Sequence, residues 1–345
     1  MKIIIASYQS IMLNPGGPSY KTLQMKEGLL QAGIDAELFD MWNKNLKFGK
    51  NDLVHLFNAS ISTYALAKNL SLNGTRYVVN PIFFSNHSAK TLRNYQRFEK
   101  PFRNIFKRSI SDYKLTKSIC NGAEMVLPNT KEEGDLLVNG LGIEKNKIRV
   151  IHNGVEKRFA NANPKLFVEK YGLNDFILYV GHLGPVRKNG LNIIKALRQI
   201  DHPVVIIANV LKNDEGQKCL ENIAESKNIT HINWLDHDDP LFASAYAACK
   251  TFILPTRYET PGRAALEAGL AGANIVITPF GGTKEYFGNM VDYPDPHSIE
   301  SIKNTIKNSL NKPKSNKLKN HIIKNFIWEI IVQKTIKIYK EIIDK

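Results

Sequence analysis

Cysteine and long apolar runs are scarce in this sequence. Its 345 residues include three cysteines, Cys120, Cys219 and Cys249, which lie far apart along the chain. Their number is odd and their spacing fits neither a disulfide framework nor a zinc site, so a reducing cytosol is expected. No apolar stretch approaches the roughly 18 residues that indicate a membrane span. The opening MKIIIASYQ holds too short an apolar run for a signal peptide and predicts a buried strand.

Acidic residues are outnumbered by basic ones. The chain has 47 lysines and arginines against 32 aspartates and glutamates, which gives a formal net charge of +15. This balance favours an anionic partner: a nucleotide, a phosphorylated lipid, an anionic membrane face or nucleic acid. The alternative is a lysine- and asparagine-rich composition that is basic without any such partner. No recognition motif with interleaved aromatic residues supports nucleic acid.

Short apolar runs alternate with helical patterns in two series. This alternation predicts an α/β fold in which parallel sheets are covered by helices on both faces, in two doubly wound domains. We expect strands at residues 2–7, 34–40, 52–59, 76–84, 123–129, 147–154, 175–184, 203–210, 229–236, 251–256 and 274–280. We expect helices at residues 19–33, 189–200, 216–228, 240–250 and 327–345.

The two series meet near residues 155–172, where the segment KRFANANPKLF interrupts the periodicity. We therefore expect an N-terminal domain over residues 1–158, a C-terminal domain over residues 159–327 and an amphipathic helix over residues 328–345. Two such domains that face each other leave a cleft at the carboxyl ends of their strands. Ligands bind at such ends because helix N-termini present free N–H groups there.

The stretch LPTRYETPGRAALEAGLAG, residues 254–272, places two carboxylates around the start of one predicted helix. Glu259 lies in the loop after a strand, and Pro261 fits the first helical turn because its missing N–H is not needed there. Glycine at the next position lets a ligand approach the backbone closely. The free N–H groups that suit a diphosphate or a sugar hydroxyl are those of Gly262, Arg263 and Ala264.

The second carboxylate of this stretch, Glu267, lies about one and a half turns into the helix. From there it can face back toward a ligand at the helix start. A carboxylate accepts hydrogen bonds from two vicinal hydroxyl groups, such as those of a ribose. The alternative is that Glu259 caps the helix and that Glu267 is a solvated surface residue, because acidic residues are common near helix N-termini.

Several segments in a fixed order carry a resemblance to a known family. They are NPGGPSYKTLQMKEGLLQAG, AEMVLPNTKEEGDLLVNGLGIEKNKIRVIHNGV, FILYVGHLGPVRKNGLNIIKAL, YETPGRAALEAGLAGANIVIT and FIWEIIVQKTIKIYKEI. The fourth has the Glu-x7-Glu spacing, and the last resembles a terminal helix with a Trp-Glu pair. Together they resemble the retaining GT-B glycosyltransferases of glycosyltransferase family 4, and the resemblance runs nearly end to end.

The resemblance implies a GT-B fold with two facing Rossmann-like domains. The N-terminal domain would bind the acceptor, the C-terminal domain would bind the nucleotide-sugar donor, and the terminal helix would cross back to the N-terminal domain. In that family the first glutamate contacts hydroxyl groups of the donor sugar, the second binds the nucleotide ribose and a lysine binds the diphosphate. Glu259, Glu267 and Lys188 match these positions. A departing nucleoside diphosphate needs such positive charge and oriented N–H donors.

Two positions depart from the family pattern. His182 stands where members usually carry an arginine, and a histidine is neutral for much of the time near neutral pH. Arg187 or Arg263 is therefore expected to supply the missing charge. Thr260 and Pro261 stand where an aromatic residue usually follows the first glutamate, which leaves the identity of the donor sugar open.

In the N-terminal half, Gly16 and Gly17 match the loop that approaches the phosphates and the acceptor. A plain turn after the first strand is the alternative. His87 matches a cleft histidine of the family, with Asn80 as a rival for that position and a surface histidine as a further alternative. The expected catalytic residues are Glu259, Lys188 and His87. The expected donor-binding residues are Gly16, Gly17, His182, Arg187, Lys188, Glu259, Pro261, Gly262, Arg263, Ala264 and Glu267.

The segment LDHDDP, residues 235–240, has the residue types of a metal site. It falls on the family's loop before a short helix, and members of this kind need no catalytic metal, so no metal is expected. Trp234 and Leu235 in this loop are expected to meet the nucleobase. The resemblance implies no cofactor besides the co-substrate, a UDP- or GDP-sugar, and the sequence does not choose among the bases.

Residues 89–117 form a basic segment with an apolar stripe. The basic residues are Lys90, Arg93, Arg97, Lys100, Arg103, Lys107, Arg108, Lys114 and Lys117, and the apolar residues at helical spacing are Leu92, Tyr95, Phe98, Phe102, Ile105 and Phe106. A basic amphipathic helix suits an anionic membrane face. The alternative is a stripe that packs on the sheet of the N-terminal domain while the charges are solvated.

The sequence therefore predicts a retaining glycosyltransferase that moves a sugar from a nucleotide-diphosphate sugar to a glycan or lipid-linked acceptor, in cell-surface polysaccharide biosynthesis. We expect it in the cytoplasm, with peripheral contact to the inner membrane face if residues 89–117 bind there. A nucleotide-sugar epimerase on the same fold is one alternative and would need acid and base groups around the sugar. A basic nucleic-acid-binding protein is the other.

Overall fold

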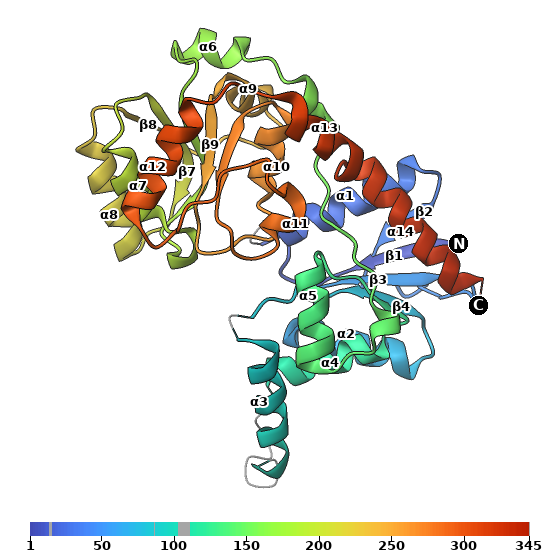
Figure 1. Ribbon diagram of the computed structural model, residues 1–345. Coiled ribbons are helices and arrows are strands. Elements are labelled where there is room, and N and C mark those ends of the chain that lie inside the picture. Colours follow the sequence, from blue (N-terminus) through green and yellow to red (C-terminus); the bar gives the residue numbers. More distant parts are fainter. Residues whose placement is uncertain (14–15, 86, 103–110, 345) are drawn as a thin grey trace. The chain divides into compact units, whose positions relative to one another are not determined.

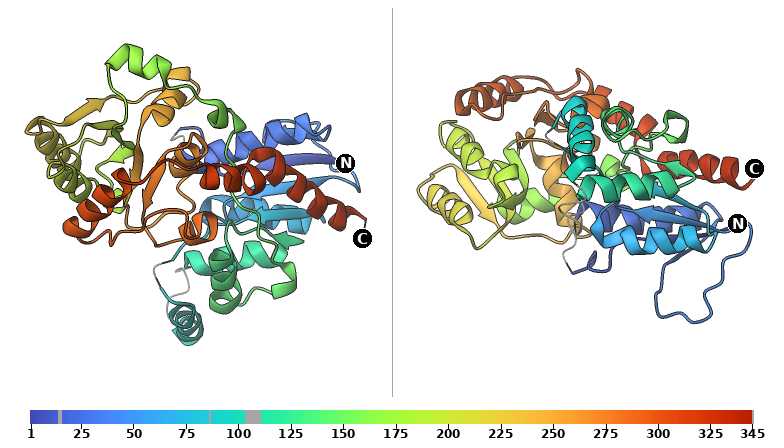
Figure 2. Two further views of the ribbon diagram at one scale, coloured as in Figure 1. Left: turned by 45° about the horizontal axis from the view of Figure 1, so that its top comes forward. Right: turned by 90° about the horizontal axis from the view of Figure 1, so that it is seen from below.

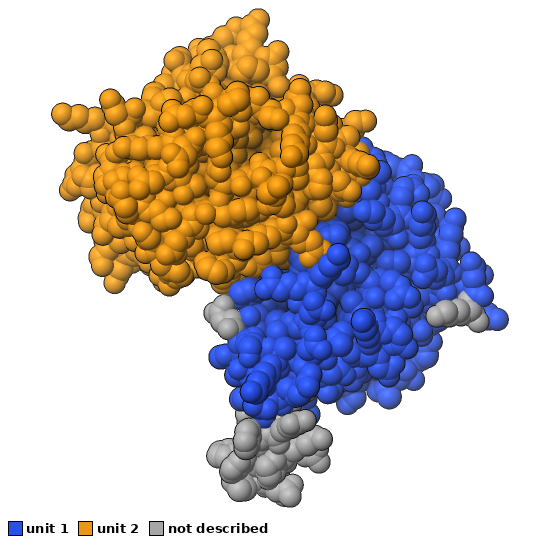
Figure 3. Space-filling model, viewed as in Figure 1, with its two compact units in different colours: residues 1–154, 328–345 blue, residues 155–327 orange. Residues whose placement is uncertain are grey.

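The computed structural model describes residues 1–13, 16–85, 87–102 and 111–344. The chain divides into two compact units, which Figure 3 shows in different colours. Unit 1 comprises Met1–Gly154 with Trp328–Lys345, and unit 2 comprises Val155–Ile327. The sequence places this division four residues later, after residue 158, and places the start of the terminal segment at the same residue, 328.

Unit 1 contains a five-stranded parallel sheet in the order β2-β1-β3-β4-β5 (Figure 1). Its strands are β1 (Lys2–Ala6), β2 (Asp35–Leu38), β3 (Leu53–Phe57), β4 (Tyr77–Asn80) and β5 (Met125–Val126). Each lies within a predicted range. The strand predicted over residues 147–154 is wrong: this stretch, which is described throughout, pairs with β5 through one bridge between Ile148 and Val126. Pro128 follows β5 closely and has no N–H for a longer ladder.

Helices cover both faces of this sheet (Figures 1 and 2). Residues of α1 (Gly17–Gln31) and α14 (Trp328–Ile343) pack on one face, and residues of α2 (Ile61–Leu72) and α4 (Asp112–Gly122) pack on the other. The other helical segments described are α3 (Ala89–Phe102), which extends away from the sheet in Figure 1, α5 (Lys131–Leu136), η1 (Leu137–Leu141) and η2 (Lys145–Lys147). Helix α1 stops where Gly33 adopts a φ of +75°, as its position in the sequence predicts.

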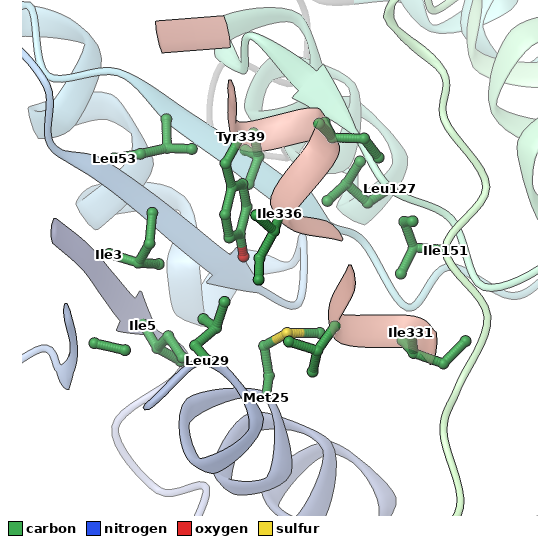
Figure 4. Close-up of a cluster of buried hydrophobic side chains, with 14 of the residues drawn as sticks. Ile3, Ile5, Met25, Leu29, Leu53, Leu127, Ile151, Ile331, Ile336 and Tyr339 are labelled. Carbon is green, nitrogen blue, oxygen red and sulfur yellow. The ribbon is translucent and has the colours of Figure 1, made fainter. Parts of the chain in front are cut away.

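The side chains of β1 alternate between two cores because successive residues of a strand point to opposite faces. Ile3 and Ile5 pack with residues of α1 and α14 (Figure 4). Ile4 packs with residues of α2 and α4. Helix α14 approaches α1 closely, since a Cβ added at Gly28 would lie 2.5 Å from a methyl carbon of Val332. The terminal helix is therefore part of the core of unit 1.

Unit 2 contains a second five-stranded parallel sheet, in the order β10-β9-β6-β7-β8. Its strands are β6 (Ile177–Leu183), β7 (Val204–Val210), β8 (Ile229–Ile232), β9 (Thr251–Leu254) and β10 (Asn274–Ile277). Its helices are α6 (Lys165–Tyr171), α7 (Gly190–Leu197), α8 (Asp214–Ala224), α9 (Pro240–Ala248), α10 (Arg263–Leu270), α11 (Thr283–Phe287), α12 (Ile299–Leu310) and α13 (Asn316–Asn325), with short turns η3 (Lys157–Asn161) and η4 (Val186–Lys188). The prediction of two doubly wound α/β domains is confirmed.

The order of strands in unit 2 reverses between β6 and β9. The chain moves from β6 outward to β7 and β8, then returns to the other side of β6 with β9 and β10. Loops at the carboxyl ends of the two strands that flank such a switch point leave the sheet toward opposite faces, and ligands bind in the crevice between them. The loops after β6 and β9 are therefore where a site in unit 2 is expected.

The basic segment of residues 89–117 is described only in part. Leu92 of α3 is buried beside Gly140 of η1, where an added Cβ would lie 3.0 Å from a Leu92 methyl carbon. The Tyr95 ring meets the Tyr113 ring edge-on. The side chains of residues 96–110 lie outside the described residues, so Phe98, Phe102, Ile105 and Phe106 are not assigned to either alternative, and membrane contact stays a prediction. Among the described helices, none is long and apolar enough to cross a membrane.

Candidate functional site

The loops after β6 and β9 are joined to each other at the switch point of unit 2. The backbone N–H of Arg257, after β9, donates to the carbonyl oxygen of Arg187, after β6, at 3.0 Å. Asn189 is buried and donates from its side chain to the carbonyl oxygens of Pro255 at 3.0 Å and Pro296 at 2.7 Å. Its φ of +58° lies in the left-handed region, which asparagine tolerates better than most residues. The sequence reading missed this residue.

Lys188, Arg187 and Glu259 form an ion-pair cluster at these joined loops. The distance to Glu259 Oε1 is 2.6 Å from Lys188 Nζ and 3.2 Å from Arg187 Nη1. Arg187 also donates to the Tyr258 carbonyl oxygen at 3.1 Å. Glu259 is 8% exposed, and among the described residues no group donates a hydrogen bond to its Oε2. One carboxylate oxygen is thus neutralised by two cations, while the other keeps its capacity to accept.

The backbone of Glu259 is fixed by the loop after β10. Its N–H donates to the Phe280 carbonyl oxygen at 3.1 Å. A Cβ added at Gly281 would lie 2.3 Å from the Glu259 carbonyl oxygen, and Gly281 has a φ of +78°. Only glycine allows this approach. The sequence shows the Gly281–Gly282 pair but does not indicate that Gly281 lies against the backbone of Glu259.

Helix α10 begins later than the sequence predicts. Its first residue is Arg263, and Gly262 precedes it with a φ of +83°, outside the helical region. Pro261 therefore lies before the helix, and its placement in the first turn is wrong. The interpretation of Glu259 as the helix cap is also wrong, because the N-cap residue is Gly262. The first N–H groups of an α-helix lack the carbonyl oxygen four residues earlier that the later ones use, so helix starts in general are rich in donors.

Glu267 lies inside α10 and is 1% exposed. Its Oε1 lies 2.9 Å from His237 Nε2 and 3.1 Å from Arg263 Nε, and its Oε2 accepts from the Tyr246 hydroxyl at 2.9 Å. The alternative of a solvated surface residue is therefore wrong. Burial raises the pKa of Glu267, but Arg263, His237 and Tyr246 together outweigh it and hold the pKa below its ordinary value. Glu267 is consequently ionised at neutral pH.

The contact between His237 and Glu267 was not predicted from the sequence. His237 belongs to the LDHDDP segment, and its ligand atoms and those of Glu156 and Asp238 lie within 4.8 Å of one another. Such a group could hold a metal ion. The guanidinium of Arg158 already lies among them, at 2.8 Å from Glu156 Oε2 and 3.5 Å from Asp238 Oδ1. A cationic side chain thus supplies the positive charge that these carboxylates require.

His182 and Trp234 lie together at the carboxyl ends of β6 and β8. Their rings are parallel to within 8°, with centroids 5.3 Å apart. Burial lowers the pKa of His182, and the charges of Lys188 and Arg187 lower it further, so the imidazole is neutral at neutral pH. The positive charge at the switch point accordingly comes from Lys188 and Arg187. Trp234 is 45% exposed, and Leu235, next in the chain, is half-buried.

The remaining predicted residues lie in unit 1. Gly16 is the N-cap of α1, Gly17 is its first residue, and a Cβ added at either would meet open space. His87 is exposed, and its backbone N–H donates to Ser85 Oγ at 3.1 Å. Asn80 is buried at the end of β4, where its side chain donates to the Leu127 carbonyl oxygen. The functional roles of these residues stay predictions.

Asn80 belongs to a buried polar cluster at the carboxyl ends of β4 and β5. Lys21 Nζ donates to Asn129 Oδ1, and Glu133 Oε2 accepts from the Asn129 backbone N–H at 2.7 Å. Burial lowers the pKa of Lys21 and raises that of Glu133. Asn80 Oδ1 is buried and accepts no hydrogen bond from the described residues. The sequence reading missed Lys21 and Glu133, which look like ordinary helix-surface residues.

Comparison with known proteins places a family match on unit 2. Residues 166–326 match the family described as glycosyl transferases group 1. An uncharacterized 41.2 kDa protein in the cps region of Klebsiella pneumoniae is 24% identical over 298 residues, which are 82% of this chain and 76% of that protein. An uncharacterized glycosyltransferase of Methanocaldococcus jannaschii is 27% identical over 248 residues, 70% of this chain and 66% of that protein. The O-antigen chain mannosyltransferase B of Escherichia coli is 25% identical over 186 residues, 50% and 48%.

Solved structures share the fold of the whole chain. Sucrose-phosphate synthase from Thermosynechococcus elongatus has a TM-score of 0.74 at 16% identity and covers 99% of each chain. Anabaena HepE in complex with UDP and glucose has a TM-score of 0.71 at 17% identity and covers 99% of this chain and 100% of that one. The predicted GT-B fold is thus confirmed. With the family match, these likenesses support a GT-B glycosyltransferase.

The depressed pKa of Glu267 leads to a prediction about stability and pH. A carboxyl whose pKa is lower in the folded protein stabilises it above the unfolded pKa, about 4.3, and this contribution is lost as pH falls through the folded pKa. We expect Glu267→Gln to lower the melting temperature at neutral pH, and the difference from the wild type to shrink as the pH falls below about 4. Thermal melts across this range, with the exposed Glu221→Gln as control, measure it. A difference that stays constant or grows toward acid pH would contradict the assignment.

Proposed function

We propose that the chain is a retaining glycosyltransferase that moves a sugar from a nucleoside diphosphate donor to a glycan or lipid-linked acceptor. The observation that carries the proposal is the pairing of Lys188 and Arg187 with Glu259 at the switch point of unit 2. Cations at this point suit a diphosphate leaving group, whose negative charge grows as its bond to the sugar breaks. The match of residues 166–326 to the group 1 glycosyl transferases supports the same reading.

Each part of the donor has a proposed partner in unit 2. Lys188, Arg187 and the N–H groups at the start of α10 bind the diphosphate. Glu259, through Oε2, accepts a hydrogen bond from a hydroxyl group of the sugar, and the buried carboxylate of Glu267 accepts a hydrogen bond from the ribose. The exposed indole of Trp234 offers an aromatic face on which a base can stack. UDP in the Anabaena HepE structure supports a UDP donor, and a GDP-sugar is the alternative.

The acceptor and cellular setting form the less specific part of the proposal. The relatives include a protein of a cps region and an O-antigen chain mannosyltransferase, which supports a role in the synthesis of a surface polysaccharide. We propose that Gly16 and Gly17, with His87 or Asn80, serve the acceptor side. The reaction would take place in the cytoplasm, with residues 89–117 on an anionic membrane face. Binding to anionic and not to neutral vesicles tests the membrane contact.

A donor screen tests the function directly. Thermal shifts across UDP-, GDP- and ADP-sugars should single out one nucleotide, and that donor should lose its sugar to an acceptor glycan. Glu267→Ala should weaken binding of the free nucleoside diphosphate, because a ribose contact is made in the ground state and the transition state alike. No stabilisation by any nucleotide would contradict the proposal. So would conversion of the donor sugar to an epimer without an acceptor.

The role of Lys188 yields a prediction on turnover. We expect Lys188→Ala to lower kcat on the order of a hundredfold, because one electrostatic donor to the developing charge is lost. Initial rates of nucleoside diphosphate release measure it. The matched control is Lys195→Ala, which removes an exposed lysine of α7 in the same unit. If Lys188→Ala keeps wild-type turnover while Arg187→Ala does not, the diphosphate role belongs to Arg187.

We also propose that the transfer needs no divalent cation. Lys188 and Arg187 supply positive charge at the switch point, and Arg158 lies 2.8 Å from Glu156 Oε2 and 3.5 Å from Asp238 Oδ1. Activity should therefore survive EDTA at a concentration well above that of the enzyme, as measured by initial rates. Loss of activity with EDTA and recovery with manganese or magnesium would show that a metal ion takes part.

The arrangement around Glu259 leads to a prediction on stereochemistry. The charge of a carboxylate is shared by both oxygens, so the two cations at Oε1 also lower the nucleophilicity of Oε2. We therefore propose that Glu259 does not attack the sugar. The acceptor hydroxyl oxygen bonds to the anomeric carbon on the face that the leaving phosphate departs from, and its proton passes to a phosphate oxygen. NMR of the product should show the anomeric configuration of the donor. An inverted product would contradict retention, and a trapped glycosyl ester on Glu259 would contradict its role here.

A further inference from the structure

The carboxylate of Glu267 is held on both oxygens by neighbouring side chains. His237 Nε2 lies 2.9 Å from Oε1, and the Tyr246 hydroxyl donates to Oε2 at 2.9 Å. A carboxylate has about four acceptor positions, two on each oxygen. His237 Nε2 and Arg263 Nε both lie within hydrogen-bonding distance of Oε1, and Tyr246 uses one position on Oε2. One acceptor position therefore remains on Oε2 for a hydroxyl group of the ligand. The side chain of Arg263 is 30% exposed, whereas that of Glu267 is 1% exposed.

The hydrogen-bond network fixes which nitrogen of His237 carries the proton. Arg158 Nη2 lies 3.1 Å from His237 Nδ1 and also donates to the His237 carbonyl oxygen at 2.7 Å. A guanidinium has only donors, so Nδ1 must accept. With Nδ1 as the acceptor, the ring proton is on Nε2, which donates to Glu267. Metal-binding histidines are oriented in a similar way, by a hydrogen bond at the ring nitrogen that does not bind the metal.

The chain of contacts that ends at Glu267 is itself held in place. Arg158 is paired with Glu156 at 2.8 Å, and its guanidinium lies 4.4 Å from the centre of the buried Phe159 ring. The His237 ring packs against two aromatic rings, with centroids 5.6 Å from Phe159 and 5.4 Å from Phe242. A ring that packs against two aromatic rings, at interplanar angles of 61° and 54°, and has a partner at each nitrogen is restricted to one orientation. It therefore presents its N–H to Glu267 before any ligand arrives.

We propose that His237 is a positioning residue for recognition of the donor's ribose, acting through Glu267 in the tautomer that Arg158 selects. The inference rests on the proposed function, because it takes the ligand of Glu267 to be a nucleoside diphosphate. The role of the LDHDDP segment, to which His237 belongs, would then be to orient the carboxylate of Glu267. Loss of the His237 donor leaves Oε1 held by Arg263 alone, so the carboxylate turns and its remaining acceptor position on Oε2 is misaligned with the ribose hydroxyl group.

The test compares a ribonucleoside diphosphate with its 2′,3′-dideoxy analogue by calorimetry, using UDP or GDP, whichever the donor screen selects. The wild type should bind the ribonucleotide at least about tenfold more tightly, as expected for hydrogen bonds to a charged group. His237→Phe keeps an aromatic ring and removes the donor, whereas His237→Gln keeps an N–H donor and removes the ring. The control is His202→Ala, at the amino end of β7, where the ring contacts the Asp175 carbonyl oxygen.

We expect His237→Phe to reduce the preference for the ribonucleotide to near the value of Glu267→Ala while the affinity for the dideoxy analogue is unchanged. His237→Gln should recover most of the preference, and His202→Ala should keep all of it. Equal losses for both nucleotides in His237→Phe, or an unchanged preference, would overturn the role of His237. A wild type without preference for ribose, or a Glu267→Ala variant that keeps it, would instead overturn the ribose assignment and the inference with it.

Discussion

The ion pairs between Glu259 and the cations of the loop after β6 are the interaction on which the site of unit 2 depends. They join the loops of two adjacent strands, β6 and β9, that are far apart in the sequence. Removing one partner of a buried ion pair typically costs about 3 to 5 kcal/mol, and replacing the pair by apolar residues is often neutral or stabilising. A cluster of this kind is therefore a weak source of stability, and its position at a switch point points to ligand binding.

The first turns of α10 complete the site with a second carboxylate, Glu267, whose surroundings differ from those of Glu259. Glu267 is buried and ionised because Arg263, His237 and Tyr246 surround it. Its environment is set in advance, so a ligand meets an oriented carboxylate instead of a mobile one. Glu259 shares its charge with cations suited to a diphosphate, while Glu267 uses donors that leave acceptor capacity for hydroxyl groups. The different partners of the two glutamates thus suit Glu259 to a position beside the diphosphate and Glu267 to hydrogen bonding with hydroxyl groups.

The sequence predicted the sheets well and the contacts around the carboxylates only in part. Alternation and buried runs mark β1, β6 and β7 because periodicity is local. The first residue of a helix is harder to predict from the sequence. Pro261 was expected in the first turn of α10, but the left-handed backbone of Gly262 places the start of the helix at Arg263. His237 and Glu267 lie 30 residues apart, and their contact depends on the packing of α9 against α10. Nothing in the local sequence distinguishes that histidine from a metal ligand or a surface residue.

The central claim is that the switch point of unit 2 binds the nucleoside diphosphate of a sugar donor. A crystal structure with the donor bound measures this most directly. The account predicts diphosphate oxygens within hydrogen-bonding distance of Lys188 Nζ and of the first N–H groups of α10, with a ribose hydroxyl group on Glu267. A nucleotide bound elsewhere, with Lys188 still paired to Glu259 and no ligand at the start of α10, would contradict it.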